Sequence, residues 1–447
     1  MTTKNANIKV HHLTRVEGHG NIVVDVKEGK IETCEWRVPE APRFFEAMVR
    51  GRHYTEVARI TSRICGICSV GHSLASVKAT EDALGIKISP QTDKLRRILK
   101  HAENFDSHVL HVAFLVAPDL LGAPSVFPLI ATHPDVIKKA IILKKVGSDW
   151  AGLLSGRSTH PTKVVPGGFA SLPGEAYTAA QAEEVLKQIK QTILDAVPTV
   201  VDIYEVLKSV AGNIPDFTRE TEYVGLVDDV EFGLYDGKIG CLMPDGTKEL
   251  IDAADYKKVT NEWVSPLSTA KYAKHNMDSY MAGSLARVNL NSEQLHPEAK
   301  KIVEDLGFKA PCFNPYMNSI CQFIEAVHSA YTSVGLIDEL LSEGIKDEKP
   351  VEPAALSGKG VSAVDVPRGI LFHEYEYKDG FCTSGNCIIP TNQNHANIQK
   401  DFEKLVPEML EADKTEAEME LGLEMLVRAY DPCISCSTHY LDIEFKR

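Results

Sequence analysis

Apolar and polar side chains alternate along residues 7–38, on either side of the sequence KEGK. Alternation with a period of two is typical of a strand that buries one face, and Gly29 supplies a residue that turns easily. We therefore expect an N-terminal β meander over residues 7–38. The same period returns over residues 222–252, where DG pairs mark turns, and predicts a β insertion there.

Helical periodicity dominates the rest of the chain. It predicts helices over residues 43–52, 90–116, 180–212, 318–341, 395–411 and 414–429. Pro198 lies inside the third of these, where a proline kinks or splits a helix. Residues 343–367 are rich in proline, glycine and charge, which predicts a long irregular excursion. The fold class expected is α+β, predominantly α, as a single domain over residues 1–447 with a bundle of long helices and peripheral β meanders.

Composition narrows the possible partners. The 447 residues are 44% hydrophobic and carry 48 Lys and Arg against 62 Asp and Glu, a net charge of −14. That balance disfavours nucleic acid and anionic membranes as partners. The longest apolar stretches are interrupted by Asp and Pro before they reach bilayer length, and the first residues lack the apolar core of a signal peptide. We expect a cytoplasmic chain without a membrane span.

Two pairs of closely spaced cysteines carry the candidate chemistry. Cys65 and Cys68 lie in RICGIC, and Cys433 and Cys436 lie in DPCISC near the other end. A three-residue spacing lets both sulfurs of a pair face one point, so the two pairs predict a site with four thiolates. The spacing alone leaves a structural zinc, an iron–sulfur centre and a catalytic soft-metal site open.

The residues around these pairs resemble a known family. Five separated motifs resemble the large, nickel-bearing subunit of the [NiFe]-hydrogenases: TRVEGHG at 14–20, RICGIC followed by His72, VPRG at 366–369, IIPT at 388–391, and DPCISC followed by His439. The resemblance implies a hydrogenase large-subunit fold over the whole chain, with residues 430–447 as a C-terminal metal-binding segment and tail.

The resemblance assigns metal ligands. It implies that Cys65 and Cys433 bind nickel terminally, and that Cys68 and Cys436 bridge nickel to an iron that carries carbon monoxide and cyanide ligands. Thiolates are soft donors that suit both metals. The positions that match the family's pocket for these small ligands are Arg368, Leu371, Ile389, Pro390 and Thr391.

The same resemblance gives roles to side chains around the metals. Arg368 is expected to donate to one cyanide and to overhang the open metal position, and Thr391 to donate to the other cyanide. Glu17 matches a proton-exit glutamate beside Cys433. His72 is expected to orient a bridging cysteine through a hydrogen bond.

A second, redox-silent metal is also implied. Glu46 and His439 match a glutamate and a histidine that bind magnesium or iron in the family. The chain continues past His439 with YLDIEFKR, and the resemblance leaves two interpretations of this tail: a native end, or an extension that is removed after nickel insertion.

The implied reaction is the reversible heterolytic cleavage of dihydrogen. The proton goes to the Cys433 thiolate or to Arg368, and Glu17 relays it outward. The electrons require a partner small subunit with iron–sulfur clusters, docked near RICGIC. The chain looks most like the cytosolic cofactor-coupled class, especially enzymes that feed heterodisulfide reductase through a ferredoxin-like adaptor. NAD(P)-reducing and deazaflavin-reducing relatives stay open as alternatives.

Other assignments compete with this one. A non-catalytic scaffold like the quinone-site subunit of respiratory complex I shares the fold, but the presence of all four cysteines argues against it. A structural-zinc scaffold is the other alternative. Glu325 and His328 have metal-like spacing on a helix, yet a core or surface role is expected for such a pair. Buried, unreactive positions are expected for the remaining cysteines, which are Cys34, Cys241, Cys312, Cys321, Cys382 and Cys387.

Overall fold

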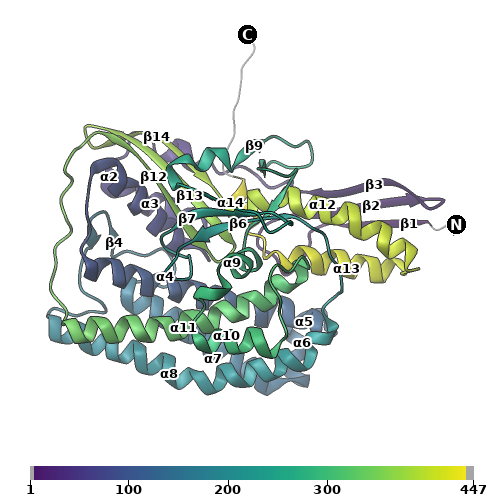
Figure 1. Ribbon diagram of the computed structural model, residues 1–447, viewed down its shortest axis with the longest axis horizontal. Coiled ribbons are helices and arrows are strands. Elements are labelled where there is room, and N and C mark those ends of the chain that lie inside the picture. Colours follow the sequence, from purple (N-terminus) through teal and green to yellow (C-terminus); the bar gives the residue numbers. More distant parts are fainter. Residues whose placement is uncertain (1–4, 439–447) are drawn as a thin grey trace, which may run out of the picture.

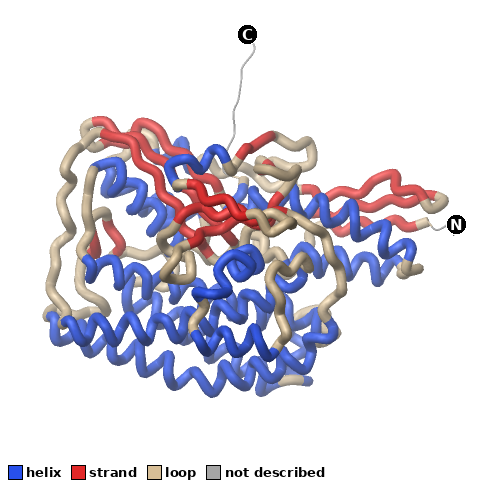
Figure 2. Tube along the Cα trace, viewed as in Figure 1, coloured by secondary structure: helices blue, strands red, loops and turns tan. Residues whose placement is uncertain are grey.

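A layer of long helices lies beneath several small β-sheets (Figures 1 and 2). The computed structural model describes residues 5–438. The helical layer consists mainly of α4 (Pro90–Leu110), α7 (Pro134–Ser155), α8 (Ala179–Val210) and α11 (Asn318–Glu343). Among the described residues, no helix is both long and apolar enough to cross a bilayer.

Helix α4 shows how the sequence sets this layer. Ser89 precedes it and accepts a hydrogen bond from the backbone N–H of Thr92 at 3.0 Å, and Pro90 occupies the first helical position. Both are favoured at helix starts, because the first N–H groups of a helix have no partner within it. Apolar residues at helical spacing, among them Leu95, Leu99 and Ala102, are buried in the main core.

Helix α8 corrects one expectation. Pro198 lies inside it, yet the helix runs unbroken from Ala179 to Val210, so of the two expected outcomes, a kink or a split, the split is wrong. A proline costs the helix a hydrogen bond and a steric clash at one turn. The buried apolar stripe on both sides of Pro198, which includes Leu186, Ile193 and Ile203, holds the two halves against the same core.

Within residues 5–438 the strands form three sheets of three or four strands and two isolated pairs. Their orders are β1-β2-β3, β11-β6-β7-β8 and β12-β13-β14, with β4–β5 and β9–β10 as the pairs. The strands are β1 (Ala6–Val10), β2 (Asn21–Lys27), β3 (Lys30–Arg37), β4 (Val164–Val165), β5 (Gly168–Phe169), β6 (Glu222–Val227), β7 (Lys238–Leu242), β8 (Lys248–Ile251), β9 (Asn261–Trp263), β10 (Tyr272–Lys274), β11 (Tyr280–Met281), β12 (Gly358–Val366), β13 (Gly369–Lys378) and β14 (Phe381–Ile388).

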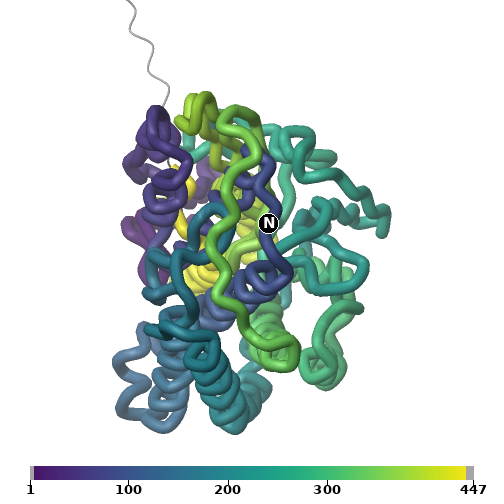
Figure 3. Tube along the Cα trace, turned by 90° about the vertical axis from the view of Figure 1, so that its left-hand side faces the viewer, coloured from purple at the N-terminus to yellow at the C-terminus, as the bar shows by residue number. Residues whose placement is uncertain are grey.

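The segment after α11 differs from the expectation in its second half. Residues 344–357 are irregular and run along one side of the molecule (Figure 3), but β12 begins at Gly358, so the excursion ends earlier than predicted. A Cβ at Gly360 would lie 2.2 Å from the backbone nitrogen of Ala83, which shows how closely β12 approaches helix α3 (Ser69–Leu84). Glycine allows this close approach. Because glycine is also typical of loops, the composition of this segment did not indicate a strand.

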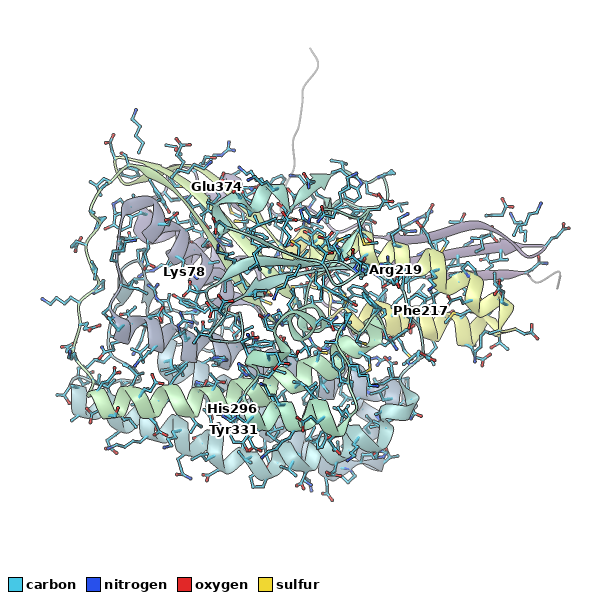
Figure 4. The ribbon with its side chains drawn as sticks, viewed as in Figure 1. Lys78, Phe217, Arg219, His296, Tyr331 and Glu374 are labelled. Atoms are coloured by element: carbon cyan, nitrogen blue, oxygen red, sulfur yellow. The ribbon has the colours of Figure 1, made fainter. Side chains whose placement is uncertain are left out.

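The remaining helices are shorter or close the chain. The helix expected over residues 43–52 is only α1 (Phe45–Val49), and the closing helices begin near the predicted positions. They are α2 (Tyr54–Thr61), α3 (Ser69–Leu84), α5 (Ala117–Leu120), α6 (Val126–Thr132), α9 (Ser284–Asn291), α10 (Pro297–Asp305), α12 (Pro390–Glu411), α13 (Glu416–Ala429) and α14 (Ile434–Ser437). The rings of His296 and Tyr331 stack at 5.1 Å where α10 meets α11 (Figure 4).

Candidate metal centre

The two cysteine pairs meet in the interior. The Sγ atoms of Cys65 and Cys433 lie 3.5 Å apart although 368 positions separate them, which confirms the predicted contact. Cys436 joins them, since one ligand atom from each of the three lies within 4.8 Å of the others. Cys65, Cys68, Cys433 and Cys436 are each no more than 3% exposed.

Local backbone structure brings Cys65, Cys433 and Cys436 close to one point, and Cys68 lies in the same buried cluster. Cys68 precedes the first turn of α3, and its backbone N–H donates to the Cys65 sulfur at 2.9 Å. Cys433 directly precedes the short helix α14. Each cysteine loop is therefore a short turn at the start of a helix.

Arg43 ties the two cysteine loops together. Its guanidinium donates to the main-chain oxygen of Ser435 at 2.8 Å and also to that of Ile64. The thiol of Cys436 donates to the same Ile64 oxygen at 3.2 Å. Sequence reasoning missed Arg43, because nothing in its spacing from the cysteines distinguishes it from a surface arginine.

Apolar side chains enclose the four sulfurs. The cysteines share one buried cluster with Leu371 and Ile389, two of the positions assigned to the small-ligand pocket, and with Phe45, Ile64, Ala75, Val364, Val366 and Cys387. Pro390, at the start of α12, is also buried. These apolar walls offer few hydrogen-bond donors.

The thiols fit a cationic occupant. A hydrogen bond from the Cys68 thiol to Cys65, together with burial, raises the pKa of Cys68 well above its ordinary value, and a hydrogen bond to Cys436 does the same for the pKa of Cys433. Burial is the main cause of the raised pKa of Cys436. Crowded thiols therefore resist ionisation until a soft dication replaces their protons.

Arg368 lies directly beside the sulfurs. It is 3% exposed, and its Nη1 donates to the Cys68 sulfur at 3.1 Å. Burial alone would lower the pKa of Arg368, but the charge of Asp431 and the nearby cysteines raises it well above its ordinary value. The side chain is a buried cation held beside the candidate metal centre.

Asp431 holds Arg368 in this position. It accepts from Nη2 of Arg368 through Oδ1 at 2.8 Å and from Nε through its main-chain oxygen at 2.6 Å. Its other carboxylate oxygen accepts from Gln322 at 2.9 Å. Asp431 has a φ of +50°, a conformation that aspartate tolerates better than most residues. Asp431 is the first residue of DPCISC, but nothing in the sequence indicated its role.

A second buried arginine fixes the backbone before Arg368. Arg287 donates to the main-chain oxygens of Val366 at 2.9 Å and Pro367 at 3.0 Å, and it pairs with Glu325 and Asp365 at 2.7 Å each. Glu325 is therefore occupied in a core ion pair, and its expected role outside the metal site is confirmed. Sequence patterns gave no sign of Arg287.

Thr391 and His72 both lie in the interior beside the cysteine loops. The hydroxyl oxygen of Thr391 accepts from the backbone N–H of Cys433 at 3.0 Å, which leaves its own proton for donation. Nδ1 of His72 lies 3.2 Å from Nε2 of His373. His373 in turn lies 2.6 Å from the hydroxyl of Tyr375, so the ring of His72 belongs to a buried polar chain.

Glu17 contacts the second cysteine loop. Its carboxylate accepts from the backbone N–H of Ser435 at 3.1 Å and from the hydroxyl of the same residue. Its main-chain oxygen accepts from Ile434 at 2.9 Å. Gly18 permits this approach: its φ is +86°, and a Cβ there would lie 2.7 Å from the Ser435 nitrogen.

Glu46 lies in the interior, whereas His439 lies outside the described residues. Glu46 is 9% exposed and accepts from the backbone N–H of Cys387 at 2.8 Å. Burial raises the pKa of Glu46 to about 7, which a bound cation would reverse. Its carboxylate is therefore suited to a metal.

The remaining cysteines follow the expectation only in part. Cys241, Cys321, Cys382 and Cys387 are buried, but Cys34 and Cys312 are half-buried, so the prediction is wrong for these two. Cys34 lies on strand β3 of the outlying N-terminal sheet, and Cys312 lies in the loop after α10. Both pack against the edge of the main core.

Comparisons with known proteins agree with this geometry. The profile of the family described as nickel-dependent hydrogenase matches residues 43–128 and 247–439. The alpha chain of sulfhydrogenase 2 from Pyrococcus furiosus is 31% identical over 98% of this chain and 100% of its own length. A component of the F420-non-reducing hydrogenase of Methanothermobacter thermautotrophicus is 31% identical over 97% of this chain and 95% of its own length.

The solved structures agree as well. An NAD⁺-reducing [NiFe]-hydrogenase in the H₂-reduced state superposes with a TM-score of 0.83 at 26% identity, over 97% of this chain and 99% of that one. The expected fold class and hydrogenase large-subunit fold are thereby confirmed. With both cysteine pairs inside the matched residues, the chain belongs to the nickel-dependent hydrogenase family and is an oxidoreductase that acts on dihydrogen.

Proposed function

We propose that Cys65, Cys68, Cys433 and Cys436 hold a nickel–iron centre, with Cys65 and Cys433 on nickel alone and the other two shared with iron. The observation that carries this proposal is the meeting of both pairs in one apolar pocket, with the cation of Arg368 against Cys68. When bound, such a centre supplies the Lewis acidity and the redox couple that dihydrogen cleavage requires.

The pocket walls support an iron that carries carbon monoxide and cyanide. Leu371, Ile389 and Pro390 exclude water from this side, and Thr391 has a hydroxyl proton to donate. Arg368 contributes the other donor. A cyanide ligand accepts hydrogen bonds, whereas carbon monoxide fits an apolar wall. The two donors therefore suit two cyanide ligands, one beside Arg368 and one beside Thr391.

Proton movement is the task of Cys433 and Glu17 in this proposal. Arg368 stays charged, so its role is to stabilise negative charge at the sulfurs rather than to accept a proton. The Cys433 thiolate accepts the proton. Glu17, beside the loop that carries Cys433, then takes this proton up and relays it outward. The Ser435 contacts hold the Glu17 carboxylate beside that loop and so support this assignment.

The second metal, magnesium or iron, is proposed at Glu46 and His439. The buried Glu46 carboxylate supplies one hard oxygen ligand. A metal there would join α1 to the end of the chain, where Arg43 and Thr438 already share a backbone hydrogen bond of 3.0 Å.

We propose that the electrons pass to an iron–sulfur small subunit, which docks near RICGIC in a cytoplasmic complex. The two relatives are each named as one component of a larger enzyme, which supports a heteromeric assembly. The acceptor proposed is a heterodisulfide reductase system reached through a further electron-transfer subunit, because the F420-non-reducing relative matches almost the whole chain. The NAD⁺-reducing structure supports NAD⁺ as the second candidate.

Dye reduction tests the catalytic proposal. The complex, purified without oxygen, is expected to reduce benzyl viologen under dihydrogen, and Cys436→Ser is expected to abolish the reaction together with nickel binding. Cys382→Ser is the matched control, since it removes a buried thiol outside the proposed ligands. Equal rates for wild type and Cys436→Ser would contradict the proposal. Ferredoxin and NAD⁺, offered separately to the wild-type complex, distinguish the two acceptors.

A further inference from the structure

A second group of metal-binding side chains lies in the β6–β7 region. Ligand atoms of Glu222, Cys241 and His275 all lie within 4.8 Å of one another. Glu222 begins β6, Cys241 lies on β7, and His275 directly follows β10. Cys241 belongs to a different apolar cluster from the four cysteines of the candidate metal centre.

Strand register explains why the first two meet. Val224 pairs with Cys241, and Glu222 lies two residues before Val224, on the same face of the sheet. Glu222 and Cys241 are both completely buried, and His275 packs over them with its side chain 10% exposed. The three donors therefore come from separate segments that the fold brings together.

Hydrogen bonds hold two of the donors in place. Nδ1 of His275 lies 2.7 Å from Oε1 of Glu222, and the backbone N–H groups of Asn276 and Met277 donate to Oε2 at 3.0 and 3.3 Å. Among the described residues, the Cys241 thiol makes no hydrogen bond. The Cys241 sulfur is therefore available as a metal ligand.

Glu249 lies at the open side of the group. It pairs directly with Cys241 across the β7–β8 ladder, and its Oε2 lies 3.9 Å from Nε2 of His275. The side chain of Glu249 is 52% exposed, so it can move without disturbing the core. It could close a fourth position around an ion.

We propose that Glu222, Cys241 and His275 form a zinc site, with Glu249 or water as the fourth ligand. One thiolate, one imidazole and one carboxylate are a borderline-soft set that zinc prefers over magnesium or calcium. Zinc bonds of about 2.3 Å to sulfur and about 2.0–2.1 Å to nitrogen and oxygen place neighbouring donors roughly 3.3–3.6 Å apart. The 2.7 Å contact between Nδ1 of His275 and Oε1 of Glu222 therefore widens when the ion replaces the proton between them. The site would tie the 275–277 turn to the sheet.

The alternative is a simple buried ion pair. Glu222 and His275 could serve only to anchor the turn, with Cys241 as an apolar neighbour. Burial and the carboxylates of Glu222 and Glu249 raise the pKa of Cys241, so an empty site would keep a protonated thiol. The two possibilities therefore differ in zinc content and in zinc ligands, and neither depends on the function proposed above.

Zinc analysis of the intact complex tests the proposal. We expect about one zinc per chain, and X-ray absorption at the zinc edge is expected to show one sulfur with two or three nitrogen or oxygen neighbours. Absence of zinc overturns the proposal. A zinc with four sulfur neighbours also overturns it, because that ion would occupy the four-cysteine centre instead.

Substitutions give a second, independent readout. Cys241→Ser and His275→Gln are each expected to lower the zinc content about tenfold or more after dialysis, while nickel and iron stay constant. Cys382→Ser, another buried thiol on a strand, is expected to keep the zinc. Unchanged zinc in both site variants overturns the proposal. If a variant does not fold, the absorption spectrum of the wild type still decides.

Discussion

Asp431 aims Arg368 at Cys68. The carboxylate and the main-chain oxygen of Asp431 hold two nitrogens of the guanidinium, and the third nitrogen lies 3.1 Å from the Cys68 sulfur. The aspartate stands two residues before Cys433, so the second cysteine loop positions a cation over the first. One ion pair thus links both halves of the metal centre.

Arg368→Lys tests this arrangement. A lysine keeps the charge but cannot make the same three contacts, because its ammonium is a point donor on a flexible stem. We expect dihydrogen oxidation to fall about 100-fold, the typical cost of one lost electrostatic donor, with nickel content unchanged. Dye reduction and metal analysis of the same preparation measure both.

Arg96→Lys is the control for Arg368→Lys. Arg96 is also fully buried and pairs with Glu81 through two bonds of 2.6 and 2.8 Å, and these bonds involve none of the four cysteines. Its loss is expected to lower stability and leave the activity per nickel unchanged. Equal loss of activity per nickel in the two variants would show that burial of an arginine, rather than its contact with Cys68, is what matters.

Glu17→Gln tests the proton exit. The amide keeps the size of the side chain but cannot take up a proton, so turnover is expected to fall by a factor of about 100 or more. Infrared bands of the metal ligands are expected to be unchanged. Glu40→Gln is the matched control, because Glu40 contacts the same N-terminal motif through the His19 N–H at 2.9 Å but does not contact Ser435. Wild-type rates in Glu17→Gln would contradict the proposed relay.

Much of this centre could be predicted from the sequence. The motifs around the cysteines predicted which sulfurs meet, and the Cys65–Cys433 contact is present. Helical periodicity predicted the long helices, because each buries a continuous apolar stripe. Strand β12 was missed, since its glycines and its charged neighbours resemble a loop until α3 is seen to pack against it.

The supporting residues could not be predicted. Arg43, Arg287 and Gln322 act through contacts with main-chain oxygens or with buried carboxylates, and these contacts join segments far apart in the sequence. Local sequence patterns indicate the buried and exposed faces of a helix or strand. They do not indicate which polar group of a distant segment a side chain will contact. Such residues are recognisable only once the fold is known.

Acid stability depends on Glu325. Burial would raise its pKa, but the charge of Arg287 and hydrogen bonds from His108 and Arg287 lower it from 4.5 to about 2. A lowered pKa stabilises the folded state above pH 4.5, and this stabilisation is lost as the pH falls toward 2. The shift corresponds to about 3 kcal/mol.

Glu325→Gln isolates that contribution. We expect the variant to be less stable than wild type at pH 6 by about 3 kcal/mol, with the difference shrinking as the pH falls below 4.5. Denaturant unfolding at several pH values measures this difference. A gap between the two proteins that stays constant down to pH 3 would contradict the assignment, because it would show that the charge of Glu325 is not the cause.

Glu46→Gln tests the second metal. The amide is a weaker ligand for magnesium or iron, so we expect the loss of one such ion per chain and faster proteolysis after Thr438. Nickel is expected to stay bound in complexes that already contain it. Glu56→Gln, a nearby carboxylate that caps α2 from an exposed position, serves as the control. Unchanged magnesium and iron in Glu46→Gln would exclude Glu46 as a ligand.

Metal analysis joined to infrared spectroscopy of the complex, purified without oxygen, tests the central claim most directly. The account predicts about one nickel per chain, with absorption in the carbon monoxide and cyanide stretching region that disappears in Cys436→Ser. Zinc in place of nickel, without those bands, would contradict it and leave the four cysteines as a structural site.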